Sequence, residues 1–159
     1  MISLLAPSRD KQGGFTLMEA LTVVVIVAIL ATIAYPSYVN QIRKSKRAVA
    51  KSALLDAANR EEQYFFSNRT YADAMNKLAG YTSLTPPILF DKDSTPTTVS
   101  GDALYAVSVA AVDDATACGT SPCFKLQAVP QNDQANDTAC GTFTLTSSNA
   151  KGAAGGNCW

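Results

Sequence analysis

The chain has 159 residues, with 13 Lys and Arg against 13 Asp and Glu and no His, so its formal net charge is zero. This length leaves room for one domain of ordinary size and calls for no second one. With no His as a general base and no Gly-rich phosphate loop after a strand, the sequence favours no enzyme, no cofactor and no metal. Residues 71–159 hold four Lys against eight Asp, a poor general surface for nucleic acid.

The first informative feature in chain order is an apolar run, Ala20 to Ala34, that follows a polar stretch. Glu19 is the only charged side chain between Gln12 and Ile42. An acid beside a run long enough for a membrane-spanning helix costs a few kcal/mol, so it requires a partner or a function. A secretory signal peptide has its apolar region before the cleavage site, whereas here the polar part comes first. We therefore expect the apolar run to be kept in the mature protein.

Four features of this region, in this order along the chain, resemble type IV prepilins: a cleavage junction, a glutamate, the apolar run and a proline. The junction Gly14–Phe15 resembles their cleavage site, Glu19 is the fifth residue after the cut, and Pro36 lies where many pilins have a proline. The resemblance is close over residues 9–67. It implies a leader peptide (1–14), a transmembrane and fibre-core helix (15–39) and a periplasmic pilin head (40–159) that includes the outer half of the helix.

The resemblance also implies partners and a location. A prepilin peptidase would cut after Gly14 and methylate the amino group of Phe15, and an inner-membrane assembly machinery would then draw the subunit into a pilus. The apolar helix would be solvated by inner-membrane lipid before assembly and by other pilin subunits afterwards. The Glu19 carboxylate would pair with the amino group of Phe15, in the same chain or a neighbour. The protein would move from the bacterial inner membrane to an extracellular pilus.

A long helix with a single interruption at Pro36 is predicted from Phe15 to about Ser67, because Pro36 is the single Gly or Pro between Gly14 and Gly80. Its outer half has an apolar stripe at helical spacing: Val39, Ile42, Val49, Ala53, Ala57 and Tyr64. It also carries a basic run: Arg43, Lys44, Lys46, Arg47 and Lys51. The positive-inside rule would place this run in the cytoplasm, but the junction motif takes precedence. We expect a solvated helix face rather than a binding patch.

The second half of the chain predicts a small antiparallel sheet, and hence an α+β fold. After a connecting region with a short helical turn near 72–79, three β-rich runs follow at 104–112, 123–129 and 142–146. Alternation in the first and third runs suits a sheet with one buried face.

Four cysteines in the last 42 residues suit an oxidising compartment. Three pairings are open. We favour Cys118 with Cys123, at the turn between the first two strands, and Cys140 with Cys158, at the C-terminal segment. A zinc site is the competing use, but there is no His and the first spacing is wide for a zinc knuckle.

The tail resembles minor pilins of the PilE kind, through the segment 140–145, a Gly-rich stretch and the ending Cys158–Trp159. DNA-uptake pilins of the ComP type share such a head. The resemblance favours a minor subunit in a pilin fold with a C-terminal disulfide loop. Two alternatives stay open: a competence pilin that binds DNA, and a pseudopilin of a type II secretion system.

Overall fold

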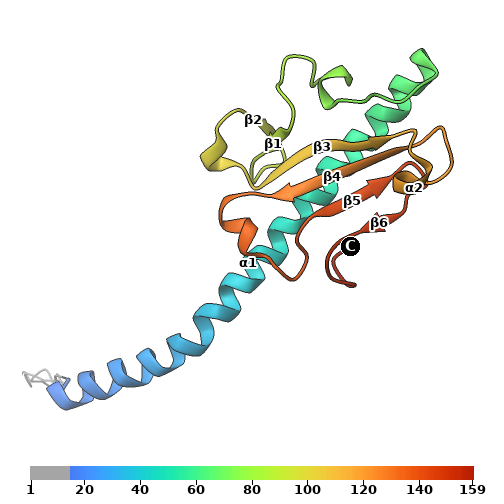
Figure 1. The fold of residues 1–159 in the computed structure, drawn as a ribbon. Coiled ribbons are helices and arrows are strands. Elements are labelled where there is room, and N and C mark those ends of the chain that lie inside the picture. Colours follow the sequence, from blue (N-terminus) through green and yellow to red (C-terminus); the bar gives the residue numbers. More distant parts are fainter. Residues whose placement is uncertain (1–14) are drawn as a thin grey trace, which may run out of the picture. The chain divides into compact units, whose positions relative to one another are not determined.

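One long helix, α1, runs from Leu17 to Asn68 (Figure 1). The computed structural model describes residues 15–159, so the expected leader, including Gly14, lies outside the described residues. The chain divides into two compact units with the boundary after Asn40, and the head unit is Gln41–Trp159. The expected interruption at Pro36 is wrong, because Pro36 lies within α1 and does not end it. Proline removes one backbone N–H, and the remaining hydrogen bonds suffice to continue the helix.

The head contains a six-stranded, fully antiparallel sheet in the order β2-β1-β3-β4-β5-β6. Its strands are β1 (Ile88–Phe90), β2 (Pro96–Thr97), β3 (Tyr105–Val112), β4 (Phe124–Pro130), β5 (Phe143–Thr146) and β6 (Lys151–Gly152). Short helices join them: η1 (Met75–Lys77), η2 (Ser100–Asp102), α2 (Ala115–Cys118) and η3 (Asn132–Asn136). The predicted α+β class and the three longer strands are confirmed, with strand ends that differ by one residue.

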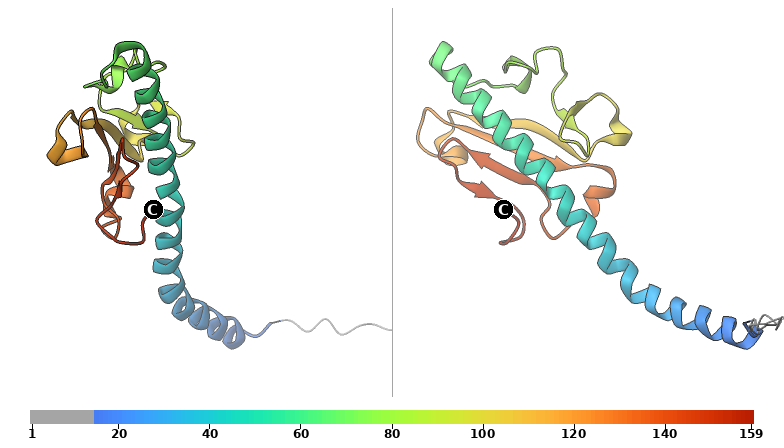
Figure 2. Two further views of the ribbon diagram at one scale, coloured as in Figure 1. Left: turned by 90° about the vertical axis from the view of Figure 1, so that its right-hand side faces the viewer. Right: turned by 180° about the vertical axis from the view of Figure 1, so that it is seen from behind.

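The core of the head lies between the sheet and the outer half of α1, which runs along one face of the sheet (Figure 2). The helix contributes mainly small side chains to this core: Val49, Ala50, Ala53, Leu54 and Ala57. Alternate residues of the strands face the helix, as Phe124, Leu126 and Ala128 do in β4. Three residues of the predicted stripe are buried, whereas Val39, Ile42 and Tyr64 are half-buried.

Two disulfides join Cys118 to Cys123 and Cys140 to Cys158, which is the pairing favoured from the sequence. Since all four sulfurs are oxidised, none is available as a zinc ligand. The second disulfide ties the C-terminal segment to the start of β5. There the Trp159 ring packs edge-on against Phe143, and its indole N–H donates to the Gly152 carbonyl at 2.8 Å.

A buried polar cluster fastens the β4–β5 connection to α1. The Arg47 guanidinium donates two hydrogen bonds to the Asp137 carboxylate, from Nε at 2.7 Å and from Nη2 at 2.8 Å. The buried Gln134 amide donates to the Arg43 carbonyl and the Tyr105 hydroxyl. Arg47 was expected on a solvated face, and this is wrong: its pKa is raised by the hydrogen bond to Asp137, which lies 90 residues further along the chain.

Asp137→Ala should lower the free energy of unfolding by about 3 kcal/mol, because it leaves the mostly buried Arg47 charge without its partner. Urea unfolding of the full chain in detergent micelles, followed by Trp159 fluorescence, measures the change. Lys92→Ala is the matched control, since it breaks an exposed pair with Asp93 and should leave the free energy of unfolding almost unchanged. Equal losses in both variants would contradict a special role for the buried pair.

Candidate functional site

The first turn of α1 holds Glu19 in a defined local setting. Thr16 precedes the helix, and its hydroxyl oxygen accepts a hydrogen bond from the Glu19 backbone N–H at 3.2 Å. Thr16 and Glu19 therefore have the spacing of a capping box, in which a hydroxyl residue is followed three positions later by an acid. A negative charge in the first turn is also favoured by the helix dipole. Sequence reasoning identified Glu19 but not the capping role of Thr16.

The N-terminal unit presents its apolar side chains to the outside along its described length. Phe15 is 83% exposed and Leu17 80% exposed, and large apolar residues continue through the segment. This part of α1 contains a stretch long and apolar enough to cross a membrane, and none of that stretch is buried within the protein. An exposed apolar surface of this kind marks a membrane or protein interaction site. The segment therefore requires lipid or a protein partner around it.

Pro36 lies in the same exposed stretch, four residues after Thr32. Because proline has no N–H, it cannot donate to the Thr32 carbonyl, so one backbone acceptor of α1 loses its usual partner. The Thr32 hydroxyl is itself engaged with the Ile29 carbonyl at 2.7 Å. Pro36 thus marks a weakened turn in a continuous helix.

The basic run of α1 is divided between two roles. Arg47 turns inward to Asp137, whereas Lys44 is exposed and Arg43, Lys46 and Lys51 are half-exposed. Within residues 15–159, the other cationic side chains outside ion pairs are Arg69, Lys125 and Lys151. The unpaired cations therefore concentrate at the start of the head unit, on one helix.

The outer face of the sheet, turned away from α1, carries a polar and almost uncharged patch over β3, β4 and β5. Ser108 faces Gln127, and their side chains are hydrogen-bonded at 3.1 Å, while Gln127 faces Thr144 on the next strand. Lys125 lies opposite Thr146 in the neighbouring row. This outer sheet face, comprising Ser108, Lys125, Gln127, Thr144 and Thr146, combines one cation with hydroxyl and amide groups. Such groups can contact phosphate and base edges of a nucleic acid.

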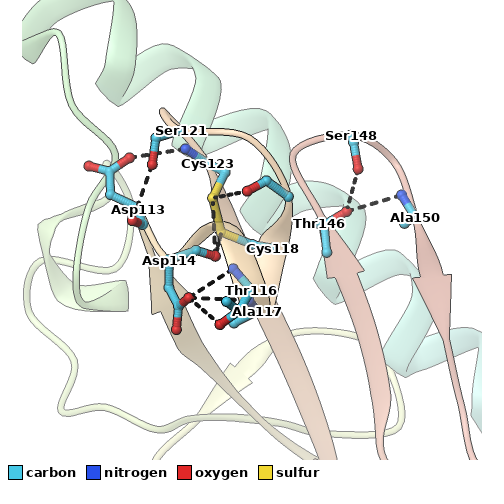
Figure 3. The surroundings of a disulfide bond; sticks show 11 residues. Asp113, Asp114, Thr116, Ala117, Cys118, Ser121, Cys123, Thr146, Ser148 and Ala150 are labelled. Atoms are coloured by element: carbon cyan, nitrogen blue, oxygen red, sulfur yellow. Dashed lines mark hydrogen bonds between the residues drawn. A yellow bond between two sulfur atoms is a disulfide. The ribbon is translucent and has the colours of Figure 1, made fainter.

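The disulfide loop between β3 and β4 uses its acids internally (Figure 3). An Asp113 carboxylate oxygen accepts the Cys123 backbone N–H at 3.0 Å. Asp114 caps α2 by accepting from the Thr116 backbone N–H and hydroxyl, and the hydroxyl bond lowers the pKa of Asp114. This pair of acids therefore supports the loop structure rather than a cation site.

Sequence reasoning missed three polar residues in the head core: Glu61, Gln134 and Asp137. Glu61 follows the buried helix positions Ala53 and Ala57 at a spacing of four, but an acid in an amphipathic helix is normally assigned to the solvent side. The spacing alone was the available signal. Asp137 and Gln134 carry no comparable signal, because they lie in a connection without periodicity.

An exposed apolar segment and an antiparallel head with a C-terminal disulfide, both on one long helix, define the class of type IV pilins and pseudopilins. Residues 9–35 match the prokaryotic N-terminal methylation motif. Residues 36–144 match the family described as type IV minor pilin ComP, DNA uptake sequence receptor. The chain therefore belongs to this family of type IV pilins, which confirms the resemblance found in the sequence.

Several curated proteins are similar over part of the chain. The type IV major pilin protein PilA of Myxococcus xanthus is 35% identical over 70 residues, which are 44% of this chain and 32% of that protein. The type II secretion system core protein G of Escherichia coli is 34% identical over 40% of this chain and 44% of its own length. The prepilin peptidase-dependent protein D of Escherichia coli is 53% identical over 23% of this chain and 25% of its own. The chain thus spans less than half the length of these relatives.

Proposed function

We propose that this pilin is a minor subunit of a type IV pilus, cut after Gly14 by a prepilin peptidase and assembled through residues 15–39. This proposal rests chiefly on the exposed apolar segment of α1, residues 15–39, in which Glu19 is the one charged side chain. Lipid solvates this surface before assembly, and the same segment of neighbouring subunits solvates it afterwards. Neither state presents water, so one surface serves both. The family description of a minor pilin supports the minor role.

The mature chain should begin at Phe15 and carry one added methyl group. Intact-mass analysis of protein extracted from membranes of cells with an active prepilin peptidase measures this directly, and the expected mass is that of residues 15–159 plus the methyl group. Peptidase-deficient cells provide the control and should yield the unprocessed chain. Recovery of the uncut chain from both strains would refute the processing step.

Glu19 guides docking in this proposal because its carboxylate attracts the amino group of a Phe15. Opposite charges attract strongly where water is scarce, and a misplaced subunit would leave both unpaired in an apolar core. Glu19→Ala and Glu19→Gln should therefore lower the ratio of fibre-associated to membrane-associated protein by roughly tenfold, equivalent to about 1.4 kcal/mol. Sheared fractions from cells provide the ratio, with wild type alongside.

Thr16→Ala is the matched control for the docking experiment. It removes the hydroxyl that accepts from the Glu19 N–H but keeps the carboxylate, and loss of a cap costs about 1 kcal/mol of helix stability. If Glu19 acts by charge pairing, this variant should assemble close to the wild-type level. An equal defect in Thr16→Ala and Glu19→Gln would instead assign Glu19 to helix capping.

The rival of a different class is the pseudopilin of a type II secretion system, and the similarity to core protein G supports it. Both kinds of subunit share the N-terminal signature, so residues 15–39 do not discriminate between them. The flanking genes, for pilus assembly or for secretion, are the least costly discriminating observation.

Capture of DNA is a second candidate function, and the match of residues 36–144 to the family of a DNA uptake sequence receptor favours it. The acidic balance of residues 71–159 opposes tight, general binding, so contacts must come from local cations. Lys125 is the cation of the outer sheet face, where hydroxyl and amide neighbours can add hydrogen bonds. We therefore expect weak binding that falls steeply with salt.

Lys125→Ala should weaken binding to duplex DNA and reduce the slope of log affinity against log salt by about 1, as expected for one lost phosphate contact. Fluorescence anisotropy with the full chain in micelles, between about 50 and about 200 mM salt, measures this slope. Lys92→Ala is the control, because Lys92 is exposed but paired with Asp93. Identical slopes for both variants would exclude the outer sheet face. Tight, sequence-dependent binding at physiological salt would make DNA capture the main function.

A further inference from the structure

Glu61 is a carboxylic acid placed in the apolar interface between α1 and the segment that follows it. Its side chain is fully buried, next to the core residue Ala57 one helical turn earlier. One carboxyl oxygen, Oε2, accepts the Ala72 backbone N–H at 2.8 Å. The other, Oε1, has no hydrogen-bond partner within residues 15–159. The charged form of such a group loses its hydration and regains a single hydrogen bond, so burial favours the neutral form.

The groups around Glu61 supply no compensating positive charge. On α1, Glu62 accepts the Tyr71 hydroxyl at 3.1 Å, and Arg60 is committed to Asp56. On the following segment Asp73 is paired with Lys77. The negative charge of Asp113, in the β3–β4 loop, is one of the smaller causes that raise the pKa of Tyr71. The strand residues that pack against this part of the helix are apolar. The pKa of Glu61 is raised to about 7, chiefly by burial. The hydrogen bond from the Ala72 N–H lowers this pKa, and the neighbouring charges of Glu62 and Asp73 raise it by smaller amounts.

The hydrogen bond from the Ala72 N–H joins the Glu61 carboxyl to the segment that follows α1. Arg69 ends the helix with a positive φ of 60°, and residues 70–74 then turn back over α1. Tyr71 packs between Phe65, with ring centroids 4.7 Å apart, and Phe124, at 4.9 Å. Ala72, the next residue in the chain, is buried. Hydration of an ionised Glu61 therefore requires this segment to move, because Ala72 covers the carboxyl.

We propose that Glu61 is a proton-controlled latch: its neutral carboxyl fastens residues 69–74 to the end of α1, and its ionised carboxyl releases them. In the closed state residues 69–74 are fastened to α1, and in the open state they are released. The open-state carboxyl is hydrated and has its ordinary pKa, so the closed state binds the proton more tightly and low pH favours closure. Closure is most stable at pH values below the open-state pKa. It weakens as pH rises from the open-state value to the closed-state value and is constant above it. The segment thus loosens near neutral pH and uncovers the Phe65–Tyr71 pair.

Amide exchange at Ala72 tests the latch, measured on the full chain in micelles between pH 5 and pH 8. Glu61→Gln is run at each pH as the reference, so that the intrinsic pH dependence of exchange cancels. Gln keeps an acceptor for the Ala72 N–H and cannot ionise. The protection of wild type and variant should differ least at the low end, closest to the open-state pKa. The protection of wild type should then fall relative to the variant by up to about tenfold per pH unit until the closed-state pKa is passed.

A second variant keeps the experiment decisive if Glu61→Gln fails to fold. Glu62→Gln retains Glu61 but removes the adjacent negative charge, so the pH at which Ala72 loses protection should move downward. Asp133→Asn, which removes an exposed acid on η3, should leave that pH unchanged. A ratio between wild type and Glu61→Gln that stays constant from pH 5 to pH 8, or equal midpoints in Glu62→Gln and wild type, would overturn the proposal.

Discussion

The close approach of the outer half of α1 to the sheet is the contact on which the head depends. A sheet of short strands cannot bury its inner face alone, and the helix provides the second layer. The side of the helix that faces the sheet carries small side chains, Ala50, Ala53 and Ala57, so the helix backbone can approach the sheet closely. Larger side chains of the sheet, such as Phe124 and Phe143, fill the space between the two layers. Protein interiors are packed as densely as organic crystals, and pairing large with small side chains across facing layers helps to reach that density.

The polar contacts of the head follow from the same geometry, because they close the two ends of the interface. At one end, Arg47 and Gln134 fix the β4–β5 connection to the helix. At the other end, Glu61 holds the chain just after α1 through the Ala72 N–H. The two ends differ in electrostatics, since Arg47 has a carboxylate partner and Glu61 has no cation among its neighbours. The first contact is therefore expected to hold across neutral pH, and the second is the one sensitive to it.

The sequence was sufficient for the long helix and the three longer strands, because these elements carry their own periodic signal. The 65 residues between Gly14 and Gly80 contain no glycine and a single proline, which favours a long helix. The alternation of residues on the two faces of a strand over 104–112 predicts β3. The strands β1, β2 and β6 have only two or three residues, too few for a period, and they form because a neighbouring strand offers hydrogen bonds. The continuity of α1 through Pro36 also depends on neighbouring turns rather than on the residue itself.

The two halves of α1 differ in their surroundings: the first half exposes apolar side chains, whereas the outer half buries one face against the sheet. This difference explains which site residues could be predicted from the sequence. From Phe15 to Tyr38 all apolar positions are exposed, so a single acid stands out. Glu19 lies in the turn where a capping hydroxyl and the helix dipole favour a negative charge. In the outer half, acids and bases are frequent, and burial alone distinguishes Glu61 from Glu62. That burial is created by residues 69–74 and by strands more than 25 residues away along the chain. A local pattern can therefore identify a charge that is out of place in its own segment, but not one that becomes buried only when distant segments pack over it.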